Sequence, residues 1–214
     1  MRRIEEAAAT RARLESETDP ALLARFRSGD SAAFDSLVRQ HADAVYRFAL
    51  RLTGRAHEAE DVAQETFARA LRHAREFREE SGFRTWLFRI AINLERDAAR
   101  RRQASPFAAR DRATDDALDA APDKGLTSDV SFAAESRERL DAVRALVDSL
   151  PPMQRDTLIL RVYEELPYAE IAEILRISVG AAKMNLLYAR RKLAARIRPE
   201  PDDGDDDAIA KDIE

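Results

Sequence analysis

The sequence predicts an all-α protein in which two small helical domains are joined by a flexible acidic linker. The first observation is composition: the 214 residues are rich in Ala, Leu, Arg and Glu and include only 6 Gly and 8 Pro, which favours helices over a sandwich or barrel. The second is charge. Residues 20–103 and 136–198 each carry a net charge of +4, whereas residues 104–135 carry −4 and residues 199–214 carry −7. Two basic, apolar-patterned blocks therefore flank an acidic linker, with an N-terminal extension (residues 1–19) before them and an acidic tail after them.

Several classes of protein are excluded by what the sequence lacks. It contains no Cys, which rules out a disulfide scaffold, a thiolate zinc site and a cysteine nucleophile. No apolar run approaches about 20 residues, and residues 1–19 have no apolar core typical of a signal peptide. We therefore expect a soluble, cytoplasmic protein.

The first block contains four expected helices. Asp19-Pro20 begins a short helix, with Asp19 as the cap, that ends near residues 28–30. Ser31 can cap a second helix, which Gly54 ends. The third helix spans about residues 57–74 and the fourth about residues 83–102, each with apolar residues three or four positions apart. Their expected buried residues are Val62, Ala63, Phe67, Ala70 and Leu71 in the third, and Phe83, Trp86, Leu87, Ile90, Ala91 and Leu94 in the fourth.

The linker and the second block follow. Residues 103–132 lack sustained periodicity and contain Pro, Gly and many Asp, a composition typical of a flexible linker. Four further helices are expected at residues 136–150, 153–164, 168–175 and 178–197, with Pro151-Pro152 closing the first of them. The Asp-rich tail from residue 199 should repel itself and stay disordered.

The last two helices have the spacing of a helix-turn-helix, in which the second helix can enter the DNA major groove. A turn at residues 176–178 joins them, and Ser178 is the expected cap. We expect the second helix to bury Val179, Ala182, Leu186, Leu193 and Ile197 and to expose Gly180, Lys183, Met184, Leu187, Tyr188 and Arg191. Arg190 and Lys192 lie nearby for phosphate contacts. The same pattern also fits a plain helical hairpin with a solvated basic face.

Two polar stripes mark the first block. Asp61, Gln64, Glu65 and Ala68 share one helix face, which can dock a protein or simply face solvent. On the fourth helix, Arg89, Asn93, Arg96 and Arg100 form a stripe, extended by Arg101 and Arg102, that can follow a phosphate backbone while the Asn reads a base edge. The preceding loop, residues 78–82 between Phe77 and Phe83, can accept an unstacked base. The spacing of Trp86 indicates core packing.

Together these motifs resemble the extracytoplasmic-function (ECF) group of sigma-70-type RNA polymerase sigma factors. The resemblance rests on residues 61–67 (Asp-Val-Ala-Gln-Glu-Thr-Phe), 85–93 (Thr-Trp-Leu-Phe-Arg-Ile-Ala-Ile-Asn), 150–155 (Leu-Pro-Pro-Met-Gln-Arg), and 168–172 (Tyr-Ala-Glu-Ile-Ala) with Ser178-Val-Gly180. It implies that residues 20–103 form a sigma region 2 domain and residues 136–198 a sigma region 4 domain. It further implies that the chain directs promoter-specific transcription initiation.

The resemblance also assigns surfaces. Asp61, Gln64, Glu65 and Ala68 would bind the β′ clamp helices of core RNA polymerase. The −10 element would be melted and read by Arg78, Arg84, Arg89, Asn93, Arg96 and Arg100. The −35 element would be read by Ser178, Gly180, Lys183, Met184, Leu187, Tyr188, Arg190 and Arg191, in a domain that also contacts the β flap. The linker would run toward the RNA exit path.

The resemblance implies an anti-sigma factor as a further partner. It implies no catalytic residue, metal, cofactor or small-molecule substrate. One departure from the family is visible. Members often carry more basic residues in the middle of the recognition helix, where this chain has Met184, Asn185, Leu187 and Tyr188. Apolar side chains can contact thymine methyls but cannot fork onto guanine, so a typical −35 preference is not expected.

Three alternatives stay open at this point. A stand-alone helix-turn-helix regulator would bind duplex DNA without polymerase and would leave the Asp61 stripe without a purpose. A helical metal-dependent hydrolase would use the cluster of His57, Glu58, Glu60 and Asp61, but the His residues lie on different faces. An anti-sigma or scaffold protein is disfavoured by the two basic faces.

Overall fold

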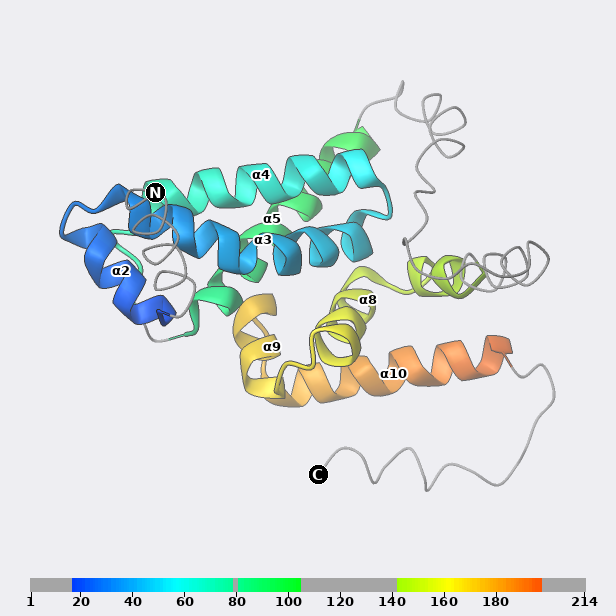
Figure 1. The fold of residues 1–214 in the computed structure, drawn as a ribbon. Coiled ribbons are helices and arrows are strands. Elements are labelled where there is room, and N and C mark those ends of the chain that lie inside the picture. The colour runs from blue at the N-terminus through cyan, green and yellow to red at the C-terminus, as the bar shows by residue number, and fades with distance from the viewer. Residues whose placement is uncertain (1–16, 79–80, 105–141, 198–214) are drawn as a thin grey trace, which may run out of the picture. The chain divides into compact units, whose positions relative to one another are not determined.

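The computed structural model describes residues 17–78, 81–104 and 142–197, and the regular elements in these ranges are all helices (Figure 1). This confirms the all-α fold class. The chain divides into two compact units, Met1–Ala120 and Ala121–Glu214. The acidic tail (residues 199–214), nearly all of the predicted linker (residues 104–135) and most of the N-terminal extension lie outside the described residues, so their boundaries stay predictions.

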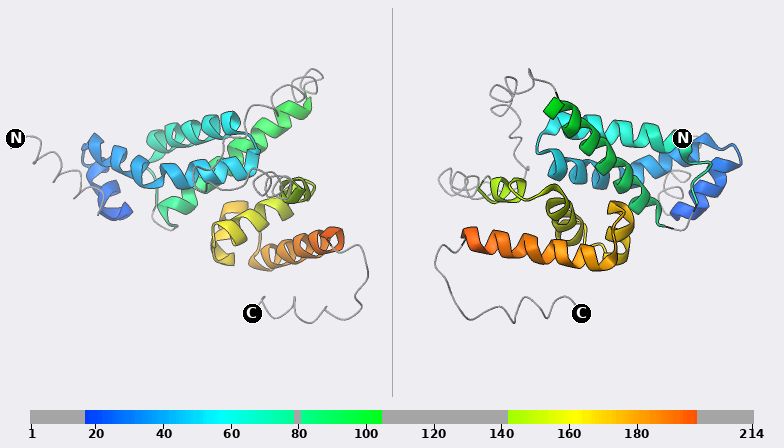
Figure 2. Two further views of the ribbon diagram at one scale, coloured as in Figure 1. Left: turned by 45° about the vertical axis from the view of Figure 1, so that its right-hand side comes forward. Right: turned by 180° about the vertical axis from the view of Figure 1, so that it is seen from behind.

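Unit 1 contains α2 (Asp19–Arg27), α3 (Ser31–Thr53), α4 (Ala56–His73) and α5 (Phe83–Ala104). The three long helices α3, α4 and α5 pack side by side (Figure 2), each in contact with the other two. At the centre of the unit, the fully buried rings of Phe48 on α3 and Phe88 on α5 stack with centroids 4.3 Å apart. Burial of such large apolar side chains is the main force that holds the unit together.

The helix starts differ by one residue from the expected ones. Asp30, not Ser31, caps α3, and its side chain accepts a hydrogen bond from the Ala32 N–H at 3.1 Å. Asp19 is the first residue of α2 rather than its cap, and its Oδ1 lies 2.8 Å from Nε2 of His41 on α3. Neighbouring Asp and Ser residues offer the same capping chemistry, so the pattern cannot choose between them. Gly54 ends α3 as predicted, in a left-handed conformation with φ 79°.

The buried face of α4 is narrower than expected, and that of α5 is wider. Leu71 is 47% exposed and Phe67 only half-buried, whereas Thr66 is fully buried and donates a hydrogen bond to the Val62 carbonyl at 2.6 Å. On α5, Phe88 and Ile92 are buried although the expected core omitted them, and Ile90 is half-buried. Because α3 and α4 both contact α5, its buried side exceeds a single amphipathic stripe.

Unit 2 contains helical residues 142–148, α8 (Pro152–Leu158), the π-helix η1 (Ile159–Tyr163), α9 (Tyr168–Leu175) and α10 (Val179–Ile197). The helix expected at residues 153–164 is therefore an α-helix that widens into one π turn. The core of unit 2 contains Leu150, Leu158, Leu186 and Ala189, with Leu193 packed against them. Val179 was expected to be buried but is 44% exposed. It is the first residue of α10 and precedes the helical turn that packs in the core of unit 2. The burial of Ile197 lies outside the description.

The turn between α9 and α10 contains a position that favours glycine. Arg176 ends α9 with φ 56° and ψ 48°, a left-handed conformation that costs a non-glycine residue about 1 kcal/mol. We predict that Arg176→Gly raises the free energy of unfolding of unit 2 by about 0.5–1 kcal/mol. Urea unfolding followed by circular dichroism measures the change. Glu173→Gly, on the exposed side of α9, is the matched control and should lower stability by a similar amount. Equal losses in both variants would contradict the assignment.

Candidate nucleic-acid interface

The predicted acidic stripe lies on the surface of α4. The stripe lies on the side of α4 opposite the buried residues Ala59, Val62, Thr66 and Ala70. Asp61, Gln64 and Ala68 are exposed, and the Asp61 side chain is 68% accessible with its Oδ2 3.4 Å from Nδ1 of His57. The structure thus brings the stripe together as a continuous polar surface of one helix.

Glu65 differs from the rest of the stripe because its carboxylate already has partners. Its Oε1 accepts hydrogen bonds from Nε of Arg69 at 2.8 Å and Nη2 of Arg72 at 3.1 Å. The hydrogen bond from Arg69, with the added charge of Arg72, lowers the pKa of Glu65 below its ordinary value. Glu65 therefore stays ionised and organises two arginines beside Asp61 and Gln64.

We predict that the Glu65 carboxyl titrates below the ordinary glutamate pKa of about 4.3, and that Arg69→Ala moves it back up. A depressed pKa in the folded state means that the interaction adds stability above the unfolded-state pKa. This stability is lost as the pH falls through the folded-state pKa. Carbon-detected NMR titration of the side-chain carboxyl measures the midpoint. An unchanged midpoint in Arg69→Ala would contradict this ion-pair geometry.

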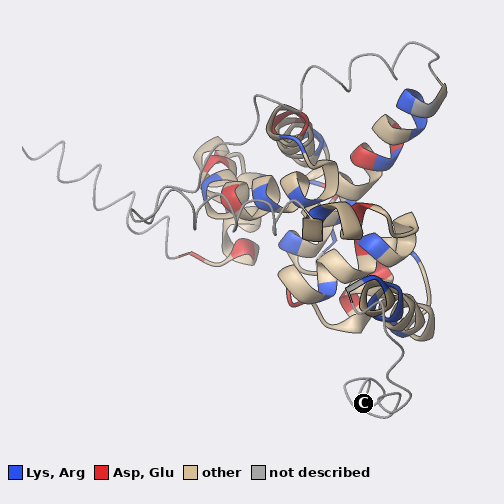
Figure 3. Cartoon of the chain, turned by 90° about the vertical axis from the view of Figure 1, so that its right-hand side faces the viewer, with Lys and Arg blue, Asp and Glu red and all other residues tan. Residues whose placement is uncertain are grey.

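The predicted basic stripe lies on the surface of α5. Asn93 and Arg100 are exposed, Arg89 and Arg96 are half-exposed, and Arg78 is exposed before the helix. Lys and Arg positions are interspersed with Asp and Glu positions along the helices (Figure 3); Arg100, for example, forms an ion pair with Asp97.

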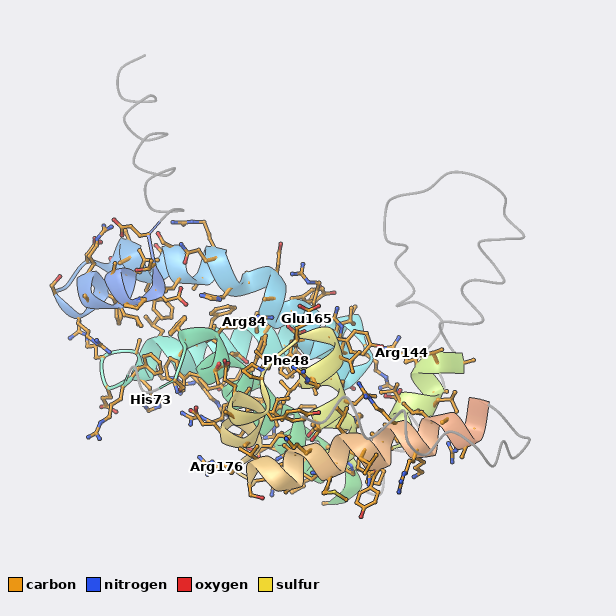
Figure 4. All side chains as sticks on the ribbon, turned by 90° about the horizontal axis from the view of Figure 1, so that it is seen from below. Phe48, His73, Arg84, Arg144, Glu165 and Arg176 are labelled. Atoms are coloured by element: carbon orange, nitrogen blue, oxygen red, sulfur yellow. The ribbon has the colours of Figure 1, made fainter. Side chains whose placement is uncertain are left out.

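Arg84 is set apart from this stripe. Its guanidinium carbon lies 4.9 Å from the ring centroid of the buried Phe88, whose ring stacks on Phe48. Arg84 and Phe48 are labelled in Figure 4. The side chain is half-buried. Arg84 thus covers the aromatic core of unit 1, a packing role that its position before the stripe did not reveal.

An ion pair joins the C-terminal end of α5 to α4. Arg102 donates to Oε2 of Glu58 at 3.1 Å and lies 3.7 Å from Oε1 of the buried Glu95. Arg55 also binds Glu58, at 3.2 Å. Arg102 was expected to extend the basic stripe, but it is part of an ion-pair network that holds the two helices together.

The aromatic residues around the loop before α5 are part of the core. Phe77, Phe83 and Trp86 are at most 8% exposed and pack with ring centroids 4.6–5.8 Å apart. The core role of Trp86 is confirmed. The rings of Phe77 and Phe83 pack in the core, and the acceptance of an unstacked base by the loop between them stays a prediction. Residues 79–80 of the loop lie outside the description.

The helix-turn-helix of unit 2 has the expected bounds and cap. The N–H of Ala181 donates to Oγ of Ser178 at 3.1 Å, so Ser178 caps α10. The exposed residues of α10 include Gly180, Met184, Tyr188 and Arg191, whereas Lys183, Leu187 and Arg190 are half-exposed. All lie away from the buried Ala182, Leu186 and Ala189.

Three basic residues of α10 make contacts within unit 2. Lys183 Nζ lies 5.8 Å from the ring centroid of Tyr168, a ring that Arg161 also covers at 5.0 Å. Lys192, expected to contact phosphate, donates to the Ser149 carbonyl at 3.4 Å. Arg196 donates to Oγ of the same Ser149 at 2.5 Å. The contact of two cations with the Tyr168 ring could not be predicted from the spacing of the residues.

Within residues 17–78, 81–104 and 142–197, no three His, Asp or Glu side chains are grouped so as to hold a metal ion. In the same part of the chain no helix is long and apolar enough to cross a membrane.

Comparison with known proteins connects these surfaces to a family. Residues 37–105 match the family model for sigma-70 region 2, and residues 140–193 match the model for sigma-70, region 4. The chain is 34% identical over 188 residues to the RNA polymerase sigma-H factor of Pseudomonas aeruginosa, covering 87% of this chain and 97% of that protein. The chain belongs to the ECF family of RNA polymerase sigma factors.

Other relatives agree with this membership. The ECF sigma factor SigW of Bacillus subtilis is 34% identical over 183 residues, covering 80% of this chain and 92% of SigW. The ECF sigma factor SigE of Mycolicibacterium smegmatis is 38% identical over 169 residues, and the match covers 78% of this chain and 63% of SigE. Among solved structures, CnrH in complex with the cytosolic domain of CnrY aligns with TM-score 0.62 at 27% identity, covering 86% of this chain and 100% of CnrH. The alternative of a metal-dependent hydrolase is thus replaced by a transcription initiation factor.

Proposed function

We propose that this ECF sigma factor divides its work between three helical faces. The α4 stripe docks on core RNA polymerase, α5 engages the −10 element, and α10 reads the −35 element. The observation that carries the proposal is that each face is solvent-exposed on a helix whose opposite side is buried in its own unit. A family that must hold both polymerase and promoter needs such presented surfaces.

The docking surface on α4 consists of Asp61, Gln64, Glu65 and Ala68. The exposed Asp61 carboxylate offers charge to a basic partner, and the small Ala68 permits close approach of another helix. Glu65 serves by holding Arg69 and Arg72 in place. The β′ clamp helices of the polymerase are the proposed partner.

The DNA surface of unit 1 consists of Arg78, Arg89, Asn93, Arg96 and Arg100. Arginines at helical spacing along one side of α5 suit a single-stranded phosphate backbone, and the Asn93 amide suits the edge of a base. Arg84, which was also predicted to contact the −10 element, lies over the ring of Phe88. Opening of the −10 element then gains binding energy from the captured strand, which offsets unstacking.

An anti-sigma factor is a proposed partner. The solved complex of CnrH with the cytosolic domain of CnrY, and that of RpoE with the anti-sigma factor NepR from Bartonella quintana, contain chains with this fold. We propose in addition that the protein acts in the cytoplasm, where polymerase and chromosome lie. The catalytic chemistry belongs to the polymerase, and this chain contributes binding and strand separation.

Asn93→Ala tests the −10 assignment. We predict that it reduces promoter opening about tenfold, because a well-placed amide–base contact is worth about 1–3 kcal/mol, while affinity for core polymerase changes less than twofold. Permanganate reactivity of unpaired thymines measures opening, and fluorescence anisotropy with core enzyme measures affinity. Asn93 is exposed, so the unfolding temperature should not change. Equal losses of opening and affinity would indicate a folding defect and contradict the assignment.

A further inference from the structure

The middle of the exposed face of α10 is apolar. Met184 is 43% and Tyr188 48% exposed, and they lie one helical turn apart on the side away from the buried Ala182 and Leu186. Half-exposed Leu187 lies beside them on the helix surface. The core of unit 2 does not use the exposed parts of these side chains, so this apolar strip is presented outward.

Cationic groups lie at the two ends of this strip. Arg176 is exposed in the turn before α10, and Arg190 and Arg191 follow Tyr188. Residues 184–189 contain neither Arg nor Lys, and Lys183 is drawn back over the Tyr168 ring. A partner that fits this surface is therefore anionic at both ends and apolar in the middle, as a major groove lined by thymine methyl groups is.

Gly180 leaves room for close approach at the start of α10. A Cβ built on it would meet only Oγ of Ser178, at 3.9 Å, so packing within the protein does not require glycine there. Glycine without an internal packing reason is suited to close approach of a partner's backbone. The beginning of α10 can therefore approach a phosphate backbone while Met184 and Tyr188 enter the groove.

We propose that Met184 and Tyr188 are specificity-determining residues that contact thymine C5 methyl groups in the −35 element. The inference rests on the proposed function of α10. It predicts an A·T-rich −35 core in place of a guanine run, because no arginine fork is available in the middle of the helix to bind guanine O6 and N7.

The test uses holoenzyme assembled from the full chain and purified core RNA polymerase. Run-off transcription from a promoter pool with a randomised −35 segment first identifies the preferred sequence. Each thymine of that segment is then replaced singly by deoxyuridine, which lacks only the C5 methyl group. We expect one or more of these replacements to lower promoter binding about fourfold, the effect of one buried methyl group.

Variants connect the effect to the two side chains. Met184→Ala or Tyr188→Ala should abolish the deoxyuridine effect at its own thymine, whereas Val143→Ala, which removes an equally exposed apolar side chain of the same unit, should retain it. Preferred −35 segments rich in guanine, or wild-type binding that is insensitive to every deoxyuridine replacement, would overturn this inference and leave the sigma function intact. A pool that yields no transcripts would overturn the proposed function, and this inference with it.

Discussion

Asp61→Arg is expected to weaken binding to core RNA polymerase about a hundredfold. The substitution removes a carboxylate from the α4 docking surface and places a cation opposite the proposed basic partner, on a helix where Glu65 already holds Arg69 and Arg72. Like charges at an interface cost several kcal/mol, and a hundredfold loss corresponds to about 2.7 kcal/mol. Anisotropy titration of labelled protein with core enzyme measures the change.

The control for Asp61→Arg is the same charge reversal at Asp35. This residue is also exposed. It lies near the N-terminal end of α3, whereas α4, which carries Asp61, follows the C-terminal end of α3. Asp35→Arg should change the affinity less than threefold. Because both residues are on the surface, neither variant should shift the unfolding temperature by more than a few degrees. Similar affinity losses in both variants would show that net charge, rather than the α4 surface, controls binding.

Phe88→Ala is expected to lower the free energy of unfolding of unit 1 by about 3–5 kcal/mol. The Phe88 ring is fully buried, stacks on Phe48 and supports the Arg84 guanidinium. A loss of this size is a large fraction of the roughly 5–15 kcal/mol that stabilises a typical domain. The single Trp of the chain, Trp86, lies in the core of the same unit, so its fluorescence during urea unfolding reports on unit 1 specifically.

Leu71→Ala provides the comparison for Phe88→Ala. Leu71 belongs to the same unit but is 47% exposed, and its truncation should cost less than about 0.5 kcal/mol. Equal effects of the two substitutions would contradict the packing of unit 1 around the Phe48–Phe88 pair.

Helix existence could be predicted from the sequence because apolar residues recur every three or four positions in both units. The bounds of α9 agree with the expected residues 168–175, where Pro167 and the turn at Arg176 mark the ends. The π turn of η1 could not be foreseen, since residues 159–163 keep a helical pattern and the widening depends on tertiary packing. Leu71 and Phe88 were misassigned because hydrophobicity alone does not say how many neighbours a helix has.

The candidate surfaces were predicted unevenly for a similar reason. The stripes on α4 and α10 depend on helical spacing, and the structure places them on exposed faces as expected. Which cations are engaged internally depends on contacts between distant residues. Arg102 binds Glu58, 44 positions away, and Lys192 binds Ser149, 43 positions away. Such pairs leave no local pattern in the sequence.

Run-off transcription with purified core RNA polymerase tests the central claim most directly. The template is a pool of promoter fragments, and reactions with and without this protein are compared. If the chain is an ECF sigma factor that reads two promoter elements, specific transcripts appear only when it is present, and their upstream sequences share a −10 and a −35 motif. An absence of specific transcripts, together with tight binding of duplex DNA by the protein alone, would contradict this account and indicate a stand-alone helix-turn-helix regulator.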